Sequence, residues 1–150
     1  MRTCIEPFAR LNLLGVLLVR PGGQCLRLSM RSYWHSLSGE EVIVFLQQIL
    51  RKVKGPIVLL WDRHPMHRRR TVQEFLATQT RLHVYYFPVA APDLNPTEFL
   101  WTQLTEYLAG TAPHNRQELQ AQVFAGIART RQSQHRLHAC LLGSQLQWIN

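Results

Sequence analysis

Two acidic residues stand where a protein can place metal ligands. Asp62 directly follows the apolar run 57–61, and Glu98 follows Asn95-Pro96, a pair typical of a helix start. In open α/β sheets, ligands bind at the carboxyl ends of the strands, which is where Asp62 is expected. Mg²⁺ prefers carboxylate oxygens, and two such ions about 3.5–4 Å apart can hold both oxygens of a phosphoryl displacement. The two acids together indicate metal-dependent phosphoryl transfer.

Each acid also has a purely structural interpretation. Asp62 could simply cap the turn that follows its strand. Glu98 lies three residues after Asn95, the predicted N-cap, and could close a capping box. The second interpretation is compatible with function, because a carboxylate in the first turn of a helix faces the positive end of the helix dipole and stays ionised.

The elements that must position these acids follow from the hydrophobic pattern. Apolar-rich stretches at 11–20 and 24–30 flank Arg20-Pro21-Gly22-Gly23 and predict a β-hairpin. Ser38 and Glu41 predict a capping box, and the helix that it opens ends before Gly55-Pro56. Buried strands are expected at 57–61 (parallel) and 82–87, helices at 67–77, 96–108 and 116–131, and a short helical turn at 137–142. This order predicts an α/β fold with a mixed sheet.

Length and composition fit one ordinary domain. The chain has 150 residues, of which 46% are hydrophobic and 17% charged, so it can bury a core. We expect a single domain over 1–150, with a poorly defined tail at 131–150. Seventeen Lys+Arg against nine Asp+Glu give a formal net charge of +8. An acidic partner is therefore favoured, nucleic acid before an anionic membrane, although a compositional bias toward Arg would give the same balance.

Several classes of protein are excluded or disfavoured. The longest apolar run, Leu13–Val19, has seven residues, whereas a bilayer span needs about 20. The first 25 residues lack the cleavage site of a signal peptide. Cys4, Cys25 and Cys140 are far apart and show neither a disulfide framework nor paired metal spacing, which favours a reducing cytoplasm.

The segments around the two acids resemble the motifs of a known family. Trp61-Asp62-Arg63-His64-Pro65-Met66-His67-Arg68 is similar to an Asp-x-x-x-x-His motif, and 35 residues separate Asp62 from Glu98. Ala91-Pro92-Asp93-Leu94-Asn95-Pro96-Thr97-Glu98-Phe99-Leu100-Trp101 is similar to a Ser/Ala-Pro-Asp-Leu-Asn-Pro-x-Glu-x-x-Trp motif. Both are motifs of the DDE-type transposases, in the bacterial insertion-sequence branch of the Tc/mariner superfamily. The resemblance covers roughly residues 10 to 130.

This resemblance implies an RNase H-like fold and two-metal cleavage and joining of DNA strands. Asp62 and Glu98 would be catalytic and would bind Mg²⁺ or Mn²⁺. The partner would be DNA, both transposon ends and target, and no membrane or small-molecule cofactor is implied. A homodimer is left open, and the place of action would be the bacterial cytoplasm, at the nucleoid. The residues implied in DNA contact are Arg63, His67, Arg68, Arg69 and Arg70, and His67 could instead help to orient the acidic site.

The sequence departs from the family pattern at three points. The family needs an Asp on the first strand of the fold, but no Asp precedes Asp62. Arg63 stands where Asn often follows the acid, and Thr105 stands where the family often has Lys. We therefore expect an N-terminally incomplete catalytic domain that lacks its first central strand, has two open strand edges and has little activity alone.

Alternative interpretations remain for several of these residues. Asp62, His64 and His67 could belong to a zinc site, although such sites need three or four close ligands. The arginine run could be a solvated surface, and Phe99 and Trp101 are expected in the core rather than against DNA bases. The whole chain could also be a non-catalytic DNA-binding or oligomerising remnant of a transposase, or an unstable gene fragment.

Overall fold

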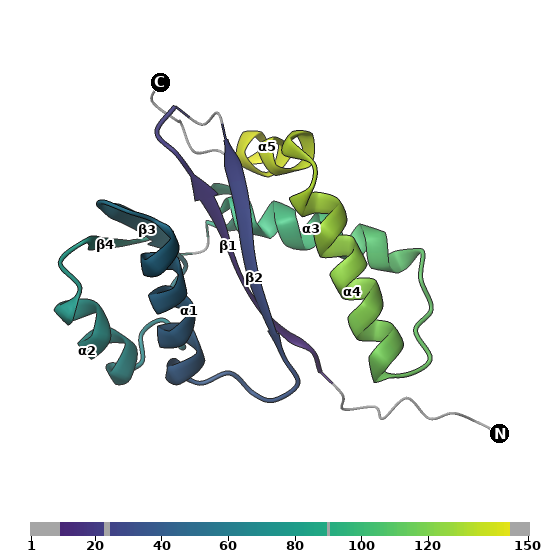
Figure 1. Ribbon diagram of the computed structural model, residues 1–150, viewed down its shortest axis with the longest axis horizontal. Coiled ribbons are helices and arrows are strands. Elements are labelled where there is room, and N and C mark those ends of the chain that lie inside the picture. The colour runs from purple at the N-terminus through teal and green to yellow at the C-terminus, as the bar shows by residue number, and fades with distance from the viewer. Residues whose placement is uncertain (1–9, 23–24, 90, 145–150) are drawn as a thin grey trace. The chain divides into compact units, whose positions relative to one another are not determined.

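The computed structural model describes residues 10–22, 25–89 and 91–144 of the chain. The elements are β1 (Asn12–Val19), β2 (Leu26–Tyr33), α1 (Gly39–Lys52), β3 (Ile57–Trp61), α2 (Arg70–Thr78), β4 (Leu82–Tyr86), the 3₁₀ turn η1 (Pro92–Leu94), α3 (Pro96–Ala109), α4 (Arg116–Arg131) and α5 (Gln134–Gly143) (Figure 1). This order confirms the predicted α/β class. The chain folds as two compact units, of which one is His35–Ala91 and the other holds the chain before and after it.

The first unit is built on the predicted hairpin. Strands β1 and β2 pair antiparallel from Asn12↔Tyr33 to Val19↔Leu26. Three helices, α3, α4 and α5, complete the unit and share one apolar core with β2. The buried members of this core are Leu26, Leu28, Leu100, Leu104, Val123, Ile127, Leu137, Cys140 and Leu141. The exposed strand positions Arg27 and Arg31 alternate with the buried ones, as expected for a strand covered on one face.

Two aromatic side chains anchor the N-terminal half of α3. A Cβ built on Gly15 would lie 2.9 Å from the ring of Trp101, so only glycine lets the indole approach β1 this closely. A Cβ on Gly143 would likewise lie 2.8 Å from the ring of Phe99. Both rings pack against the core, which confirms the prediction that they are core residues.

The second unit contains a two-stranded parallel sheet. β3 pairs with β4 in a register that runs from Ile57↔Leu82 to Trp61↔Tyr86, which confirms the predicted parallel strand. Leu59 and Trp61 are each 8% exposed, but Val58 is 63% and Leu60 is 40% exposed. The expectation of a fully buried strand is therefore wrong: side chains alternate between the two faces, and only one face is covered.

Helix α1 is fixed at both ends by side chains. The predicted capping box is present, and the Ser38 N–H donates to the Glu41 carboxylate at 2.8 Å. At the other end, the Arg81 guanidinium donates to the carbonyl oxygens of Leu50 (2.5 Å) and Val53 (2.8 Å). These are helix-end carbonyls that have no partner inside the helix, so Arg81 ties the start of β4 to the end of α1.

Two helices differ clearly from their predicted bounds, and β2 runs to Tyr33 instead of ending at residue 30. The helix expected at 67–77 begins only at Arg70, because the preceding residues form tight turns in which His67 N–H bonds His64 O and Arg68 N–H bonds Pro65 O. At the other end of the chain, α5 is a longer helix than the 137–142 turn expected, since Ser133 caps it and Leu137 and Cys140 are fully buried.

No helix of the described residues is long and apolar enough to cross a membrane.

The capping box predicts an acid-sensitive contribution to stability. The pKa of the Glu41 carboxyl is lowered, chiefly because the Ser38 hydroxyl donates a hydrogen bond to it. The ionised Glu41 carboxylate therefore contributes its full stabilisation at pH values above the ordinary carboxyl pKa of about 4.5. This contribution is lost as the pH falls through the lower pKa that Glu41 has in the folded state. Glu41→Gln keeps an acceptor but not the charge, so it should flatten this part of the pH profile in urea denaturation. Glu40→Gln, at the exposed neighbouring position, is the control, and an unchanged profile for Glu41→Gln would contradict the interpretation.

Candidate metal and nucleic-acid site

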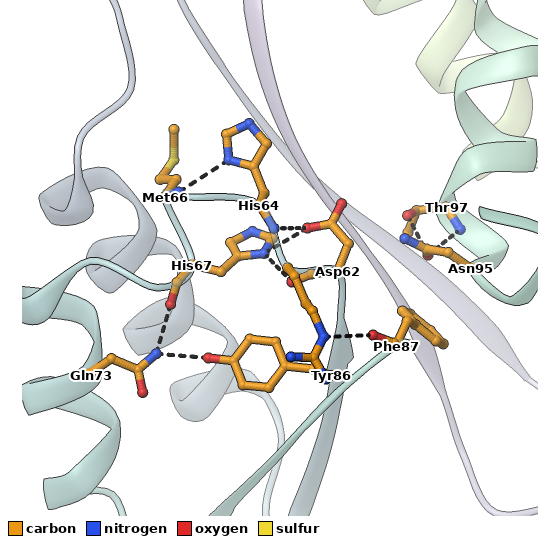
Figure 2. A network of polar contacts seen from close by, with 10 residues as sticks. Asp62, His64, Met66, His67, Gln73, Tyr86, Phe87, Asn95 and Thr97 are labelled. Atoms are coloured by element: carbon orange, nitrogen blue, oxygen red, sulfur yellow. Dashed lines mark hydrogen bonds and ion pairs between the residues drawn. The ribbon is translucent and has the colours of Figure 1, made fainter. Parts of the chain in front are cut away.

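Asp62 leaves the sheet at the carboxyl end of β3, as predicted. Its Oδ1 accepts a hydrogen bond from the His64 N–H at 3.0 Å and lies 3.0 Å from Nδ1 of His67 (Figure 2). The first contact is the hydrogen bond expected if Asp62 caps the turn that follows its strand. The second contact brings together two of the residues singled out in the sequence, Asp62 and His67.

One oxygen of this carboxylate remains open. Both contacts are made by Oδ1, and in the described part of the chain no donor bonds to Oδ2. The Asp62 side chain is 49% exposed. An exposed carboxylate with one oxygen held by the chain and the other open to solvent can accept a hard cation.

The loop that carries His67 is held from both sides. The Gln73 amide donates to the His67 carbonyl and to the Tyr86 hydroxyl, each at 2.8 Å (Figure 2). The His67 ring stacks on the indole of Trp61, with ring centroids 4.1 Å apart and planes 5° from parallel. Sequence reasoning missed Trp61, although its position directly before Asp62 at the end of a strand was a usable signal.

The basic residues that are expected to contact DNA lie on this loop or directly after it in the chain. Arg63 is exposed, and its Nε donates to the carbonyl oxygen of Phe87 at 3.3 Å. Arg68 and Arg69 are also exposed, and the Arg70 side chain is 91% exposed and pairs with Glu74 at 2.8 Å. Helix α2 has no acidic residue in its first turn. Positive charge at this helix end is mildly unfavourable, so the fold itself gains little from the run.

Glu98 does not close the capping box that its spacing suggested. The Asn95 side chain caps α3 by accepting from the Thr97 N–H at 3.1 Å, but the Asn95 N–H donates to Pro92 O instead of to Glu98. In the residues described, the Glu98 carboxylate has no hydrogen-bond or ion-pair partner. Its role is therefore not explained by helix capping.

A shallow hollow of about 350 Å³ runs along α3 beside this acid. Trp101, Thr102, Thr105 and Glu106 line it together with Glu98. The Thr105 hydroxyl donates to Trp101 O at 2.8 Å, so the residue that replaces the family's lysine bonds to its own helix. Glu98 is thus accessible at the rim of an open surface.

The two acids belong to different compact units, Asp62 to His35–Ala91 and Glu98 to the other. A metal site that uses both therefore stays a prediction. The zinc alternative finds no support, because the described residues contain no group of three His, Cys, Asp or Glu side chains that could hold a metal ion.

The capping geometry predicts effects of different size on stability for two nearby substitutions. Asn95→Ala should lower the free energy of unfolding by about 1 kcal/mol, because the N-cap bond is lost. Glu98→Gln should change it by less than about 0.5 kcal/mol, because its carboxylate bonds to none of the described residues. Chemical denaturation of both variants tests this pair, and a large loss of stability in Glu98→Gln would show that the carboxylate is structural.

Comparisons with known proteins agree with this architecture. A comparison with curated proteins returned no match. Among solved structures, the chain is similar to the catalytic domain of Mos1 mariner transposase, with a TM-score of 0.52 and 15% sequence identity over 91% of this chain and 82% of that one. This similarity confirms the predicted RNase H-like fold. The family model described as DDE superfamily endonuclease matches residues 27–120, more than half of the chain, so the chain belongs to the DDE superfamily endonucleases.

Proposed function

We propose that the chain is part of the catalytic domain of a DDE-type transposase of the bacterial insertion-sequence branch, an enzyme that cleaves and joins DNA strands when intact. The observation that carries the proposal is the state of the two motif acids. Asp62 and Glu98 each present carboxylate oxygen to which no described residue bonds, and both are open to solvent. In this proposal residues 1–150 form one partial RNase H-like domain that acts on DNA in the bacterial cytoplasm, at the nucleoid.

The donor chemistry of these acids fits divalent metal. Asp62 and Glu98 would hold Mg²⁺ or Mn²⁺, which supplies charge neutralisation and activation of the attacking oxygen when bound. Asp62 offers Oδ2, since Oδ1 is already bonded to His64 and His67. Glu98 lies in the first turn of α3, where the helix dipole favours its ionised form.

The basic residues would bind the DNA backbone beside Asp62. Arg63, Arg68 and Arg69 are exposed, and none of them forms an ion pair with a described acidic residue. Arginines of this kind contact phosphates without reading sequence. Such contacts would place a phosphodiester next to the acid.

We further propose that the domain is N-terminally incomplete. Two observations support this: no Asp precedes Asp62 in the sequence, and the described strands form two separate pairs, β1 with β2 and β3 with β4. β3 therefore keeps one edge without a partner among the described strands, and Val58 and Leu60 on it are exposed. An apolar strand with an open edge fits a missing neighbour. Translation of the DNA upstream of Met1 in three frames should reveal an Asp-bearing strand.

The metal proposal predicts binding without efficient turnover. The purified chain should bind Mn²⁺, and Asp62→Asn should weaken that binding, which electron paramagnetic resonance of free Mn²⁺ measures. Incubation with Mg²⁺ or Mn²⁺ and a labelled duplex should give little or no cleavage or strand transfer, because the first acid is absent.

Two outcomes would contradict these statements. Equal Mn²⁺ binding by the parent chain and by Asp62→Asn would remove Asp62 from the metal site. Clear cleavage by the chain, abolished in Asp62→Asn, would show instead that the missing acid is dispensable. Asp93→Asn, which changes an exposed carboxylate outside the two proposed positions, is the matched control.

The alternative is a non-catalytic remnant that binds DNA or oligomerises. The exposed arginine run favours DNA binding, and the exposed face of β3 favours self-association, including a homodimer. This function needs neither acid. It is distinguished by duplex binding that persists in the Asp62→Asn, Glu98→Gln double variant and does not respond to metal.

Both functions predict that the arginines set the salt dependence of DNA binding. Each phosphate neutralised contributes about 0.9 to the slope of log K against log salt. Removing two contacts with Arg68→Gln, Arg69→Gln should lower the slope by about 1.8, as measured by fluorescence anisotropy of a labelled duplex. Arg20→Gln, Arg51→Gln removes the same charge from other exposed positions and should leave the slope unchanged. Equal losses in both double variants would mean that only net charge matters.

A further inference from the structure

Trp61 and His67 form a stacked pair directly beside Asp62. Trp61 ends β3 and is 8% exposed, and the His67 side chain is 20% exposed. Their ring planes lie 5° from parallel at a centroid separation of 4.1 Å. The buried indole therefore fixes the plane in which the imidazole lies.

Hydrogen bonding does not explain the position of the indole. Its Nε1 is buried and has no hydrogen-bond partner among the described residues. A buried donor without a partner is unfavourable by about 1–3 kcal/mol. Among the described residues, the fold thus accepts an unpaired N–H at a position where the indole stacks on the His67 imidazole, which indicates that the ring contact is what the residue supplies.

The surroundings of the imidazole determine its tautomer. Nδ1 of His67 lies 3.0 Å from Asp62 Oδ1 and 3.0 Å from the Asp62 carbonyl oxygen (Figure 2). Both neighbours can only accept a hydrogen bond, so Nδ1 must carry the hydrogen. In the neutral ring, Nε2 then holds the lone pair and cannot donate to a phosphate oxygen.

The same contacts distinguish the two oxygens of the Asp62 carboxylate. Oδ1 receives two donors, the His64 N–H and His67 Nδ1–H, whereas no described residue donates to Oδ2. The Gln73 amide holds the His67 carbonyl and so fixes the far end of the loop. The carboxylate cannot rotate without breaking bonds to Oδ1.

We infer that Trp61 and His67 are positioning residues for Asp62. Trp61 fixes the plane of the His67 ring, which is the Nδ1–H tautomer. The Nδ1–H group locks the Asp62 carboxylate through Oδ1, so that Oδ2 is presented to a divalent cation. The identity of the cation rests on the proposed function, whereas the tautomer does not. Of the two roles that the sequence left open for His67, orientation of the acidic site and phosphate contact, this inference specifies the first and gives it an atomic basis.

Two variants of His67 separate its two contacts. His67→Phe keeps an aromatic ring for stacking on Trp61 but loses the donor. His67→Asn loses the ring but places an amide N–H near the position of Nδ1. His83→Phe, at an exposed position of β4, controls for the added aromatic ring. Urea denaturation and the amide spectrum of each full-length variant establish that it is folded.

The first measurement is the tautomer of His67 in the unmodified chain. Long-range ¹H–¹⁵N correlation at about pH 8.5 distinguishes the two neutral tautomers of an imidazole ring. The His67 signals are assigned by their loss in His67→Phe. We expect Nδ1 to be protonated, and a signal pattern of the Nε2–H form would overturn the inference.

The second measurement is the dissociation constant for Mn²⁺. Loss of a residue that orients a metal ligand lowers affinity by about 10–100-fold, so His67→Phe should bind Mn²⁺ at least about tenfold more weakly. His67→Asn should recover most of this loss, and His83→Phe should bind like the parent chain. This pattern supports the positioning role, because a residue that only fills space would be replaced well by Phe.

Failure of the inference and failure of the proposed function give different results. If Asp62→Asn weakens Mn²⁺ binding but His67→Phe does not, the positioning role is overturned and the metal site stands. If neither variant affects Mn²⁺ binding, the metal site and the presentation of Oδ2 are both overturned, even where the tautomer is the expected one.

Discussion

The parallel pairing of β3 with β4 is the constraint on which the candidate site around Asp62 depends. Because the strands run in the same direction and pair Trp61 with Tyr86, both end at one edge of the sheet. The Phe87 N–H donates to Trp61 O at 2.9 Å, which fixes the point where the chain leaves the sheet. Asp62 follows at once, so the position of its carboxylate is set by main-chain hydrogen bonds.

The ends of the two strands then hold the loop between them. Gln73 at the start of α2 bonds to Tyr86 on β4 and to the His67 carbonyl, so the return of the chain from Asp62 is tied to the neighbouring strand. Arg63 donates to Phe87 O, which is a second link between this loop and the end of β4. Loops next to a rigid sheet commonly carry function, and here the described residues restrain the loop at several points without bonding to the second oxygen of Asp62.

Much of this arrangement could be predicted from the sequence, because it depends on local patterns. Apolar periodicity gave α4 at its observed bounds, and the Ser38–Glu41 spacing identified the start of α1. The start of α2 was wrong, because the turn-forming geometry of residues 64–68 competes with helical periodicity there. The exposure of Val58 was also missed, since a continuous apolar run does not reveal which faces of a strand are covered.

The site was harder to predict because its contacts join residues through ring stacking and carbonyl geometry. Asp62 and Glu98 follow from their motifs, but the spacing of Glu98 to Asn95 suggested a capping box that the structure does not form. The Asn95 N–H donates to Pro92 O instead of to the Glu98 carboxylate, and this choice of acceptor depends on the 3₁₀ turn before the helix. The Trp61–His67 stack has no periodic signature at all, because it depends on how a loop folds back onto the last residue of a strand.

The surroundings of Asp62 also bear on whether this carboxylate is only a turn cap. A cap needs one acceptor oxygen, and the His64 N–H already satisfies that requirement. A second donor on the same oxygen, held in place by a buried indole whose own N–H has no partner in the described part of the chain, exceeds what a turn requires. If only the turn mattered, an apolar residue in place of Trp61 would give a more stable fold, because it would bury no unpaired donor. The orientation of the carboxylate, rather than its capping bond, is therefore the property that this part of the structure maintains.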